Sequence, residues 1–310
     1  MSTTRELILL DGGMGRELAR MGAPFRQPEW SALALMEAPE YVRQVHDRFI
    51  AAGAQVITTN SYAVVPFHVG EAVFAVEGKQ LAMLAGKLAR DAASAAPHAV
   101  KVAGSLPPTC GSYRADLFDR KQADRILACL ISGLAPSVDF WLAETQSTTA
   151  EVVAVRAALN LQQQRQPLWV SYTLEDENPD LTQPRIRSGE SVADAVKVAV
   201  ELHAAAILFN CSQPEVMSGA VRAARAMLNQ LGVDLPLGVY ANAFPPQSAD
   251  AQANGELDAL RPDLDPPGYA HWAARWLDEG VSIVGGCCGI GPAHIACVHD
   301  VIAGHRHPHD

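Results

Sequence analysis

The stretch Ser282-Ile-Val-Gly-Gly-Cys287 is a short apolar run near the end of the chain, and it is the eighth run of its kind. Each of these runs is apolar almost throughout, as expected of a parallel strand that is buried on both faces. Their number decides the fold, because it exceeds what an open sheet usually contains. The eight candidate strands are residues 7–13, 55–63, 99–106, 139–146, 168–174, 205–211, 235–241 and 282–287.

Longer amphipathic stretches separate the runs and have the pattern of helices. Residues 39–53 carry an acid near the start, apolar residues at helical spacing and a glycine at the end. A doubly wound sheet usually has about five or six strands, so eight strand–helix units favour an α/β fold of the closed (β/α)₈ or TIM-barrel type. We expect a single domain over residues 1–304 and a short His-rich tail over 305–310. Similar helical patterns cover residues 147–163, 190–203, 214–231 and 268–279.

The composition excludes several classes of protein. The chain has 310 residues, of which 49% are hydrophobic and 19% charged, with a formal net charge of −10. It has no Lys/Arg-rich run, so we expect neither nucleic acid nor membrane as a partner. No apolar stretch approaches the ~20 residues of a membrane helix, and Asp11 interrupts the first apolar run too early for a signal peptide. The six cysteines do not resemble a secreted disulfide framework, which predicts a cytoplasmic protein with reduced thiols.

Polar residues gather at the carboxyl ends of the predicted strands, which is where a TIM barrel carries its chemistry. Asp11 and Glu144 end strands one and four, Cys211 ends strand six, and Cys287 and Cys288 end strand eight. Two carboxylates and three thiols are therefore expected on one rim. The further candidates for substrate binding on this rim are Asn60, Tyr62, Asn210, Tyr240 and Asn242.

The three cysteines are the most specific signal. Three thiolates with one open position form a catalytic type of zinc site. Adjacent residues of a regular strand point to opposite faces, so Cys287 and Cys288 can share a metal only if the glycines around them break the strand. The alternative is that Cys211, Cys287 and Cys288 are small buried residues, which is common for cysteine. The spacing favours zinc.

Asp11 and Glu144 also have two interpretations. An acid that ends a barrel strand and is followed by glycine, as Asp11 is, can bind the ammonium group of a ligand. A strand-end acid can instead cap a helix or pair with a loop arginine. The long connection over residues 244–267, with five prolines, is likewise either a lid over the site or a plain insertion.

Several of these segments together resemble the homocysteine S-methyltransferase family over nearly the whole chain. They begin with Asp11-Gly-Gly-Met-Gly15, Trp30-Ser31 and the helix 39–53 that continues into Ala54-Gln-Val-Ile-Thr-Thr-Asn-Ser-Tyr62. Glu144-Thr145 follows, and Asn210-Cys211 with Gly285-Gly-Cys-Cys-Gly289 are the most specific matches. The sequence departs from the family pattern at Gly104-Ser-Leu-Pro-Pro108, Tyr62-Ala63 and Tyr240-Ala-Asn-Ala-Phe244.

The resemblance implies a (β/α)₈ methyltransferase with one Zn²⁺ per chain, bound by Cys211, Cys287 and Cys288. It also implies that Asp11 and Glu144 face the amino group of homocysteine. The expected reaction moves a methyl group from a cationic donor to the homocysteine sulfur and gives methionine. No Gly-x-Gly-x-x-Gly nucleotide loop opens a first helix, so S-methylmethionine is the first choice of donor and S-adenosylmethionine the second.

Three alternatives stay open at this point, as does the oligomeric state. The acceptor could be selenocysteine, selenohomocysteine or another thiol. The chain could be a redox protein in which Cys287 and Cys288 form a vicinal disulfide, or a non-catalytic barrel with structural zinc. The content of metal in the reduced protein and a methyl-transfer assay separate these alternatives.

Overall fold

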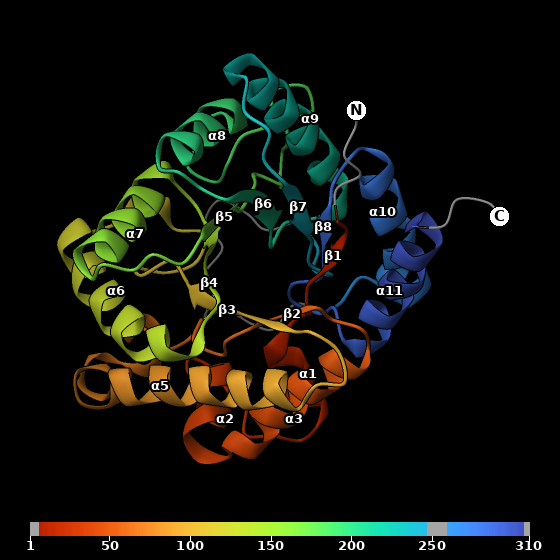
Figure 1. Ribbon diagram of the computed structural model, residues 1–310. Helices are drawn as coiled ribbons and strands as arrows, with labels where there is room; N and C mark the ends of the chain where they lie inside the picture. The colour runs from red at the N-terminus through yellow and green to blue at the C-terminus, as the bar shows by residue number, and fades with distance from the viewer. Residues whose placement is uncertain (1–5, 247–258, 307–310) are drawn as a thin grey trace.

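The computed structural model describes residues 6–246 and 259–306 and has eight parallel strands around a central axis (Figure 1). The sheet runs in the order β1-β8-β7-β6-β5-β4-β3-β2. A parallel bridge between Leu10 and Val56 joins β1 to β2 and closes the ring. The fold is therefore the predicted (β/α)₈ barrel. The strands are β1 Ile8–Leu9, β2 Val56–Thr58, β3 Lys101–Leu106, β4 Phe140–Gln146, β5 Leu168–Tyr172, β6 Ala206–Asn210, β7 Leu237–Tyr240 and β8 Ile283–Val284.

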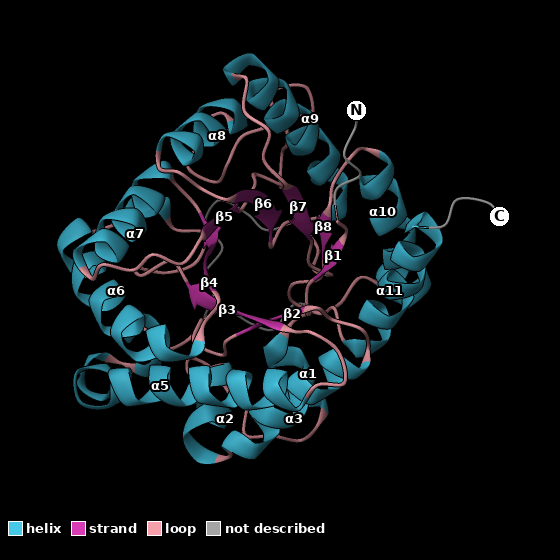
Figure 2. Cartoon of the chain, viewed as in Figure 1, coloured by secondary structure: helices cyan, strands magenta, loops and turns pink. Residues whose placement is uncertain are grey.

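Helices cover the outside of the barrel (Figure 2). Three of them follow β1 and two follow β2, which differs from the expected single helix after each strand. Among the described residues, no helix combines the length and the apolar character needed to cross a bilayer. The helices are α1 Met14–Arg20, α2 Ser31–Glu37, α3 Pro39–Ala51, α4 Pro66–Val69, α5 Glu71–Ala95, α6 Arg120–Leu134, α7 Thr149–Leu161, α8 Val192–Glu201, α9 Pro214–Leu231, α10 Pro266–Asp278 and α11 Pro292–Arg306.

Two apolar layers hold the barrel together, and the alternation of side chains along each strand separates them. In β4, Trp141 packs in the large layer between strands and helices, whereas Phe140 and Leu142 pack in a smaller layer inside the barrel. Two residues further on, Glu144 continues the inward row. The same alternation makes Tyr240 the inward residue at the end of β7. The alternation of side chains along the strands therefore points Glu144 and Tyr240 toward the barrel axis.

Each of the eight predicted runs contains one strand, and every strand is shorter than its run; β1, β2 and β8 are shortened most. β1 and β8 have two residues each, and a pair of glycines follows close after both of them. A Cβ atom on Gly286 would lie 2.1 Å from the side chain of Ile290, and one on Gly13 would lie 2.6 Å from the carbonyl oxygen of Cys287. These segments pack too closely for any other residue, and they continue as loops into the site.

The chain after β7 differs in detail from the prediction. Of the predicted connection 244–267, residues 247–258 lie outside the described residues, so the lid interpretation stays a prediction. Its last two residues already begin α10 at Pro266. At the C-terminus, α11 continues through His305 to Arg306, and His305 bonds to Asp278 with a 3.0 Å contact. The tail therefore begins later than the predicted residue 305, and residues 307–310 lie outside the described residues.

His46 in α3 is fully buried, and its two ring nitrogens have no hydrogen-bond partner among the described residues. Burial, with the nearby charge of Arg43, lowers the pKa of His46 from 6.5 to about 3. In the unfolded chain the imidazole keeps its ordinary pKa. Below pH 6.5 the unfolded state therefore binds a proton that the native state does not bind, and stability falls as the pH falls.

We expect His46→Leu to remove this loss of stability. The free energy of unfolding of the variant relative to the wild type should rise by about 2 kcal/mol between pH 8 and pH 5, from the size of the shift. Urea unfolding of both proteins at both pH values measures the difference. The other titrating groups contribute equally to both proteins and cancel. An advantage of the variant that is the same at pH 5 and pH 8 would contradict the assignment.

Candidate active site and metal centre

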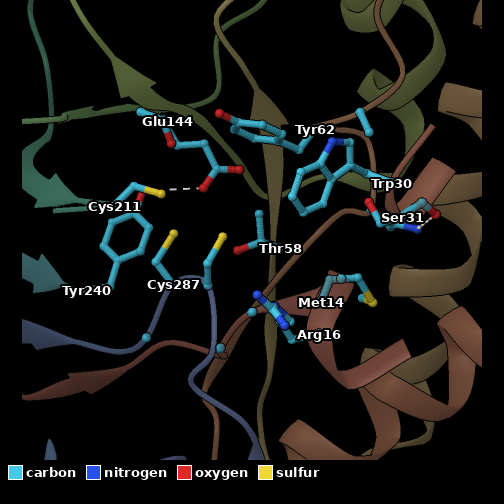
Figure 3. Close-up of a pocket in the computed structure, with 18 of the residues that line it drawn as sticks. Met14, Arg16, Trp30, Ser31, Thr58, Tyr62, Glu144, Cys211, Tyr240 and Cys287 are labelled. Atoms are coloured by element: carbon cyan, nitrogen blue, oxygen red, sulfur yellow. Dashed lines mark hydrogen bonds between the residues drawn. The ribbon is translucent and has the colours of Figure 1, made fainter. Parts of the chain in front are cut away.

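One cavity of about 200 Å³ opens at the carboxyl ends of the strands. Figure 3 shows that residues far apart in the sequence face it together, among them Glu144, Cys211 and Cys287. Asp11 and Cys288 also line it. The two carboxylates and three thiols that the sequence predicts on one rim therefore surround a single cavity.

The sulfur atoms of Cys211, Cys287 and Cys288 all lie within 4.8 Å of one another. No other His, Cys, Asp or Glu side chain within the described ranges joins this group. Three sulfurs around a tetrahedral zinc at ~2.3 Å lie about 3.8 Å apart, so small shifts bring them to bonding distance. The donor set fits a zinc ion with three protein ligands and one position left open to the cavity.

Unusual backbone conformations bring the three sulfurs together. Cys211 follows β6 with a φ of 53°, in the left-handed region that is uncommon for residues other than glycine. Cys287 leaves β8 but keeps one ladder-like bond, from its amide nitrogen to the Ala241 oxygen at 2.9 Å. Gly289 turns the chain with a φ of 86°. The break in the strand, which the glycines predicted, allows the adjacent Cys287 and Cys288 to face the same point.

The thiols are coupled to one another. Hydrogen bonds from Cys211 and Cys287 lower the pKa of Cys288 well below its usual value, and Arg16 adds a smaller lowering. Hydrogen bonds with Cys211 and Cys288, together with burial, raise the pKa of Cys287. Three thiolates so close together are therefore unfavourable without a nearby positive charge. A divalent cation supplies the charge that three thiolates need.

Glu144 and Asp11 are buried carboxylates with hydrogen bonds but no Lys or Arg partner among the described residues. Glu144 accepts from the Ser105 hydroxyl and, at 3.4 Å, from the Tyr240 hydroxyl. Asp11 accepts from the Thr58 amide at 2.7 Å and from its hydroxyl at 3.1 Å. Burial raises the pKa of Asp11 to about 8 and that of Glu144 to about 7. Two such carboxylates in one cavity can bind a cation that donates hydrogen bonds, such as an ammonium group.

Asn210 supports the site from below and does not line the cavity. Its side chain is fully buried, and its oxygen accepts from the Thr145 amide at 3.0 Å and from the Ser171 hydroxyl at 2.7 Å. Its nitrogen donates to the Thr145 hydroxyl at 2.8 Å and lies 3.9 Å from the Cys287 sulfur. Thr145 has a φ of 57°. Asn210 therefore holds the strained residue that follows Glu144.

Of the other predicted substrate-binding residues, some line the cavity and one does not. Asn60, Tyr62 and Tyr240 line the cavity, whereas Asn242 does not. Tyr62 shares a 2.6 Å hydrogen bond with Ser112. The Asn242 side chain is buried, and its oxygen accepts from the Phe244 amide at 3.3 Å. The structure thus gives Asn242, like Asn210, a place behind the cavity wall and not on it.

Tyr113 was missed by the sequence analysis. Its hydroxyl lies 2.9 Å from the Cys211 sulfur, and the guanidinium of Arg187 lies 5.0 Å from the centre of its ring. Arg187 is paired at 3.1 Å with Asp176, and both side chains are almost completely buried. Tyr113 lies in a loop, and its φ of 65° turns the ring inward. The pattern of apolar residues along the sequence does not predict the position of a loop residue of this kind.

Comparison with known proteins assigns the chain to a family. The family model for homocysteine S-methyltransferase matches residues 8–302. The chain belongs to the homocysteine S-methyltransferase family. Homocysteine S-methyltransferase of Escherichia coli (strain K12) is 31% identical over 95% of this chain and 94% of its own. Homocysteine S-methyltransferase 1 of Zea mays is 26% identical over 96% and 94% of the two chains. The protein is therefore a methyltransferase.

Solved structures of the family have the same fold. The metallated form of the homocysteine methyltransferase MmuM from Escherichia coli superimposes with a TM-score of 0.75, at 27% identity over 96% of each chain. Another relative, the selenocysteine methyltransferase of Astragalus bisulcatus, is 25% identical over 97% of this chain and 94% of its own. Both a thiol and a selenol acceptor are thus named among the relatives of this family member.

Proposed function

We propose that this family member transfers a methyl group from a small sulfonium donor to the sulfur of homocysteine, and that it uses one zinc ion held by Cys211, Cys287 and Cys288. The observation that carries the proposal is the pairing, in one cavity, of three clustered thiols with two buried carboxylates. Homocysteine offers a sulfur and an ammonium group to these two features. Zinc bound to the three cysteines would keep the acceptor sulfur in its thiolate form.

The protein residues bind and orient the acceptor. Asp11 and Glu144 accept hydrogen bonds from its ammonium group, and the Ser105 and Tyr240 hydroxyls hold Glu144 in place. The acceptor sulfur then forms a bond to the methyl carbon of the donor. The carbon–sulfur bond of the donor breaks, and its electron pair stays on the donor sulfur. The reaction needs alignment of three atoms more than it needs acid–base catalysis.

The donor is S-methylmethionine in the first instance and S-adenosylmethionine in the second. Aromatic rings supply much of the cavity wall, namely those of Trp30, Tyr62, Tyr113, Tyr240 and Phe244. A sulfonium is attracted to the face of such rings by cation–π interactions. This wall supports a cationic donor. Loss of a methyl group from S-methylmethionine leaves methionine, so that donor gives two methionines in each turnover.

A selenol acceptor is the second candidate, because two relatives are a selenocysteine methyltransferase of Astragalus bisulcatus and a selenocysteine Se-methyltransferase of Brassica oleracea. A selenol has the same ammonium and carboxylate as its sulfur counterpart. Both acceptors can therefore use the same carboxylates, and selenocysteine differs from homocysteine in its nucleophilic atom and in a side chain that is one methylene shorter.

A panel of donors and acceptors tests the proposed function. Reduced, zinc-loaded protein is mixed with homocysteine or selenocysteine and with S-methylmethionine or S-adenosylmethionine, and the methylated products are measured by mass spectrometry. We expect methionine from homocysteine and S-methylmethionine at the highest rate. A faster reaction with selenocysteine would assign the selenol as acceptor. No methylated product from any pair would refute the proposed function.

A further inference from the structure

Tyr113 makes a polar contact to the sulfur cluster that the proposed reaction does not use. Its hydroxyl oxygen lies 2.9 Å from the Cys211 sulfur, and its side chain lines the cavity. At Cys287 the polar neighbour is the side-chain nitrogen of Asn210, and this contact is longer, at 3.9 Å. Of these two sulfurs, Cys211 therefore has the stronger hydrogen bond.

The tyrosine hydroxyl is the donor when Cys211 is a metal ligand. A cysteine bound to zinc is a thiolate and carries no hydrogen, so the hydrogen in this contact belongs to Tyr113. A hydrogen bond to a charged acceptor is roughly twice as strong as one between neutral groups. Such a bond stabilises the electron pairs of the sulfur, and hydrogen bonds to metal-bound sulfur are known to tune metal centres. The sulfur of Cys211 is therefore expected to be a weaker nucleophile than a thiolate without this bond.

The ring of Tyr113 is fixed by groups that also fix the chain next to Cys211. The guanidinium of Arg187 lies 5.0 Å from the centre of the ring, and Asp176 pairs with Arg187 at 3.1 Å. The other carboxylate oxygen of Asp176 accepts from the Gln213 amide at 3.1 Å, two residues after Cys211. The hydroxyl and the sulfur are therefore held by one buried network, and the fold fixes their contact.

The proposed reaction methylates one sulfur out of four. The three cysteine ligands and the acceptor would all be thiolates, about 3.8 Å apart around the metal, so a donor that reaches the acceptor is also close to the ligands. Methylation of Cys211 would form a bond between its sulfur and the methyl carbon, while the carbon–sulfur bond of the donor breaks and leaves its electron pair on the donor sulfur. The product is a neutral thioether, without the negative charge of the thiolate ligand. Such a side reaction would damage the metal site.

We propose that Tyr113 is a positioning residue that protects Cys211 from methylation, because its hydroxyl donates to the Cys211 sulfur and lowers the nucleophilicity of this ligand. A tyrosine hydroxyl has one hydrogen. It therefore does not lower the nucleophilicity of the acceptor sulfur while it bonds to Cys211. This inference rests on the proposed function, which supplies the methylating donor.

Tyr113→Phe removes the hydroxyl and keeps the ring, and Tyr172→Phe is a matched control. Tyr172 is a buried tyrosine whose hydroxyl donates to the Ala195 oxygen at 3.0 Å, and it does not line the cavity. Each zinc-loaded protein is treated with iodomethane, which methylates sulfur and releases iodide, and peptide mass spectrometry follows each cysteine. A hydrogen bond to a charged group contributes about 10-fold or more. We therefore expect Tyr113→Phe to methylate Cys211 about 10-fold faster than the wild type, and Tyr172→Phe to match the wild type.

Cobalt substitution separates the electronic effect of the hydroxyl from a change in access to the sulfur. The Co²⁺ form of the protein absorbs light by charge transfer from thiolate to metal, and this band moves to longer wavelength when a sulfur loses a hydrogen bond. We expect that shift in Tyr113→Phe and not in Tyr172→Phe. Faster methylation of Cys211 without the shift would show that access alone has changed. That result, or a rate at Cys211 equal to that of the wild type, would overturn the inference.

These measurements are separate from the test of the proposed function, because neither iodomethane nor cobalt requires homocysteine or its donor. If the wild type forms no methylated product from any donor and acceptor, but Tyr113→Phe shows both effects, the proposed function fails and the effect of Tyr113 on Cys211 stands. If methionine forms and Tyr113→Phe shows neither effect, the role of Tyr113 fails and the proposed function stands.

Discussion

Replacing Cys211 with alanine is expected to lower the zinc content of the protein from about one ion per chain to a trace. In the proposed site Cys211 is one of three protein ligands, and two thiolates do not form a closed or a catalytic zinc site of the known types. Because Cys211 has a left-handed backbone, Cys211→Gly removes the same sulfur and also relieves the strain. Both variants should therefore lose the metal, although glycine suits the backbone better. Elemental analysis of reduced, purified protein measures the content.

Cys297→Ala provides a matched control for this experiment. Cys297 is a half-buried cysteine in α11 and does not line the cavity, so its replacement should leave the zinc content unchanged. A Cys287→Ser/Cys288→Ser double variant that keeps stoichiometric zinc would refute the metal site. A wild type without metal, whose thiol count changes with oxidant, would support the vicinal-disulfide alternative instead.

The barrel could be predicted from the sequence because its strands are buried on both faces. A run such as residues 205–211 is apolar over most of its length, and eight such runs leave few folds to choose from. The same argument places the polar residue at the end of each run on the rim. That is why Glu144 and the three cysteines could be expected in one place before the structure was known.

The residues that were misplaced or missed depend on backbone conformations that the pattern of apolar residues does not encode. Tyr113 reaches Cys211 only because its φ is positive and Arg187 lies against its ring. Asn210 is correctly on the rim side of β6, but hydrogen bonds to Thr145 turn its amide away from the cavity. Neither arrangement follows from spacing along the chain.

The position of Arg16 at the cavity could have been predicted from the sequence. It is a charged residue in the glycine-rich segment after the first strand, one turn from Asp11. The loop after a barrel strand faces the site, so a charged residue there can be expected near the cavity. The helix that follows β1 begins at Met14, and Arg16 in its first turn lines the cavity.

Replacing Glu144 with glutamine, or Asp11 with asparagine, is expected to weaken homocysteine binding while zinc is retained. Each carboxylate is buried and has no basic partner in the described part of the chain, so the ammonium group of the acceptor is its natural counter-charge. A hydrogen bond between charged groups in such a site contributes about 1.5 to 3 kcal/mol, which corresponds to a loss of about 10- to 150-fold for each variant. Zinc remains because neither residue belongs to the sulfur cluster.

4-Mercaptobutyrate, which is homocysteine without its amino group, isolates the contribution of the ammonium. If Glu144 binds the ammonium, Glu144→Gln should weaken the binding of homocysteine and leave that of 4-mercaptobutyrate unchanged, as in a double-mutant cycle. Glu151→Gln is a suitable control, because Glu151 is a buried carboxylate of the α7 cap whose pKa is also raised by burial to about 7. It does not line the cavity. Its replacement should alter stability but not the affinity for homocysteine.

The pH dependence follows from the same two carboxylates. With their pKa values raised to about 7 and about 8, both are largely protonated below pH 7 and cannot serve as counter-charges for an ammonium group. The difference in affinity between homocysteine and 4-mercaptobutyrate should therefore grow as the pH rises from 6 to 9, as first Glu144 and then Asp11 ionises. Glu144→Gln should lose the part of this increase that occurs near pH 7. Because the thiol is common to both ligands, its own ionisation cancels. A difference that does not change with pH, or loss of zinc from either variant, would show that the carboxylates support the fold or the metal site and do not bind the acceptor.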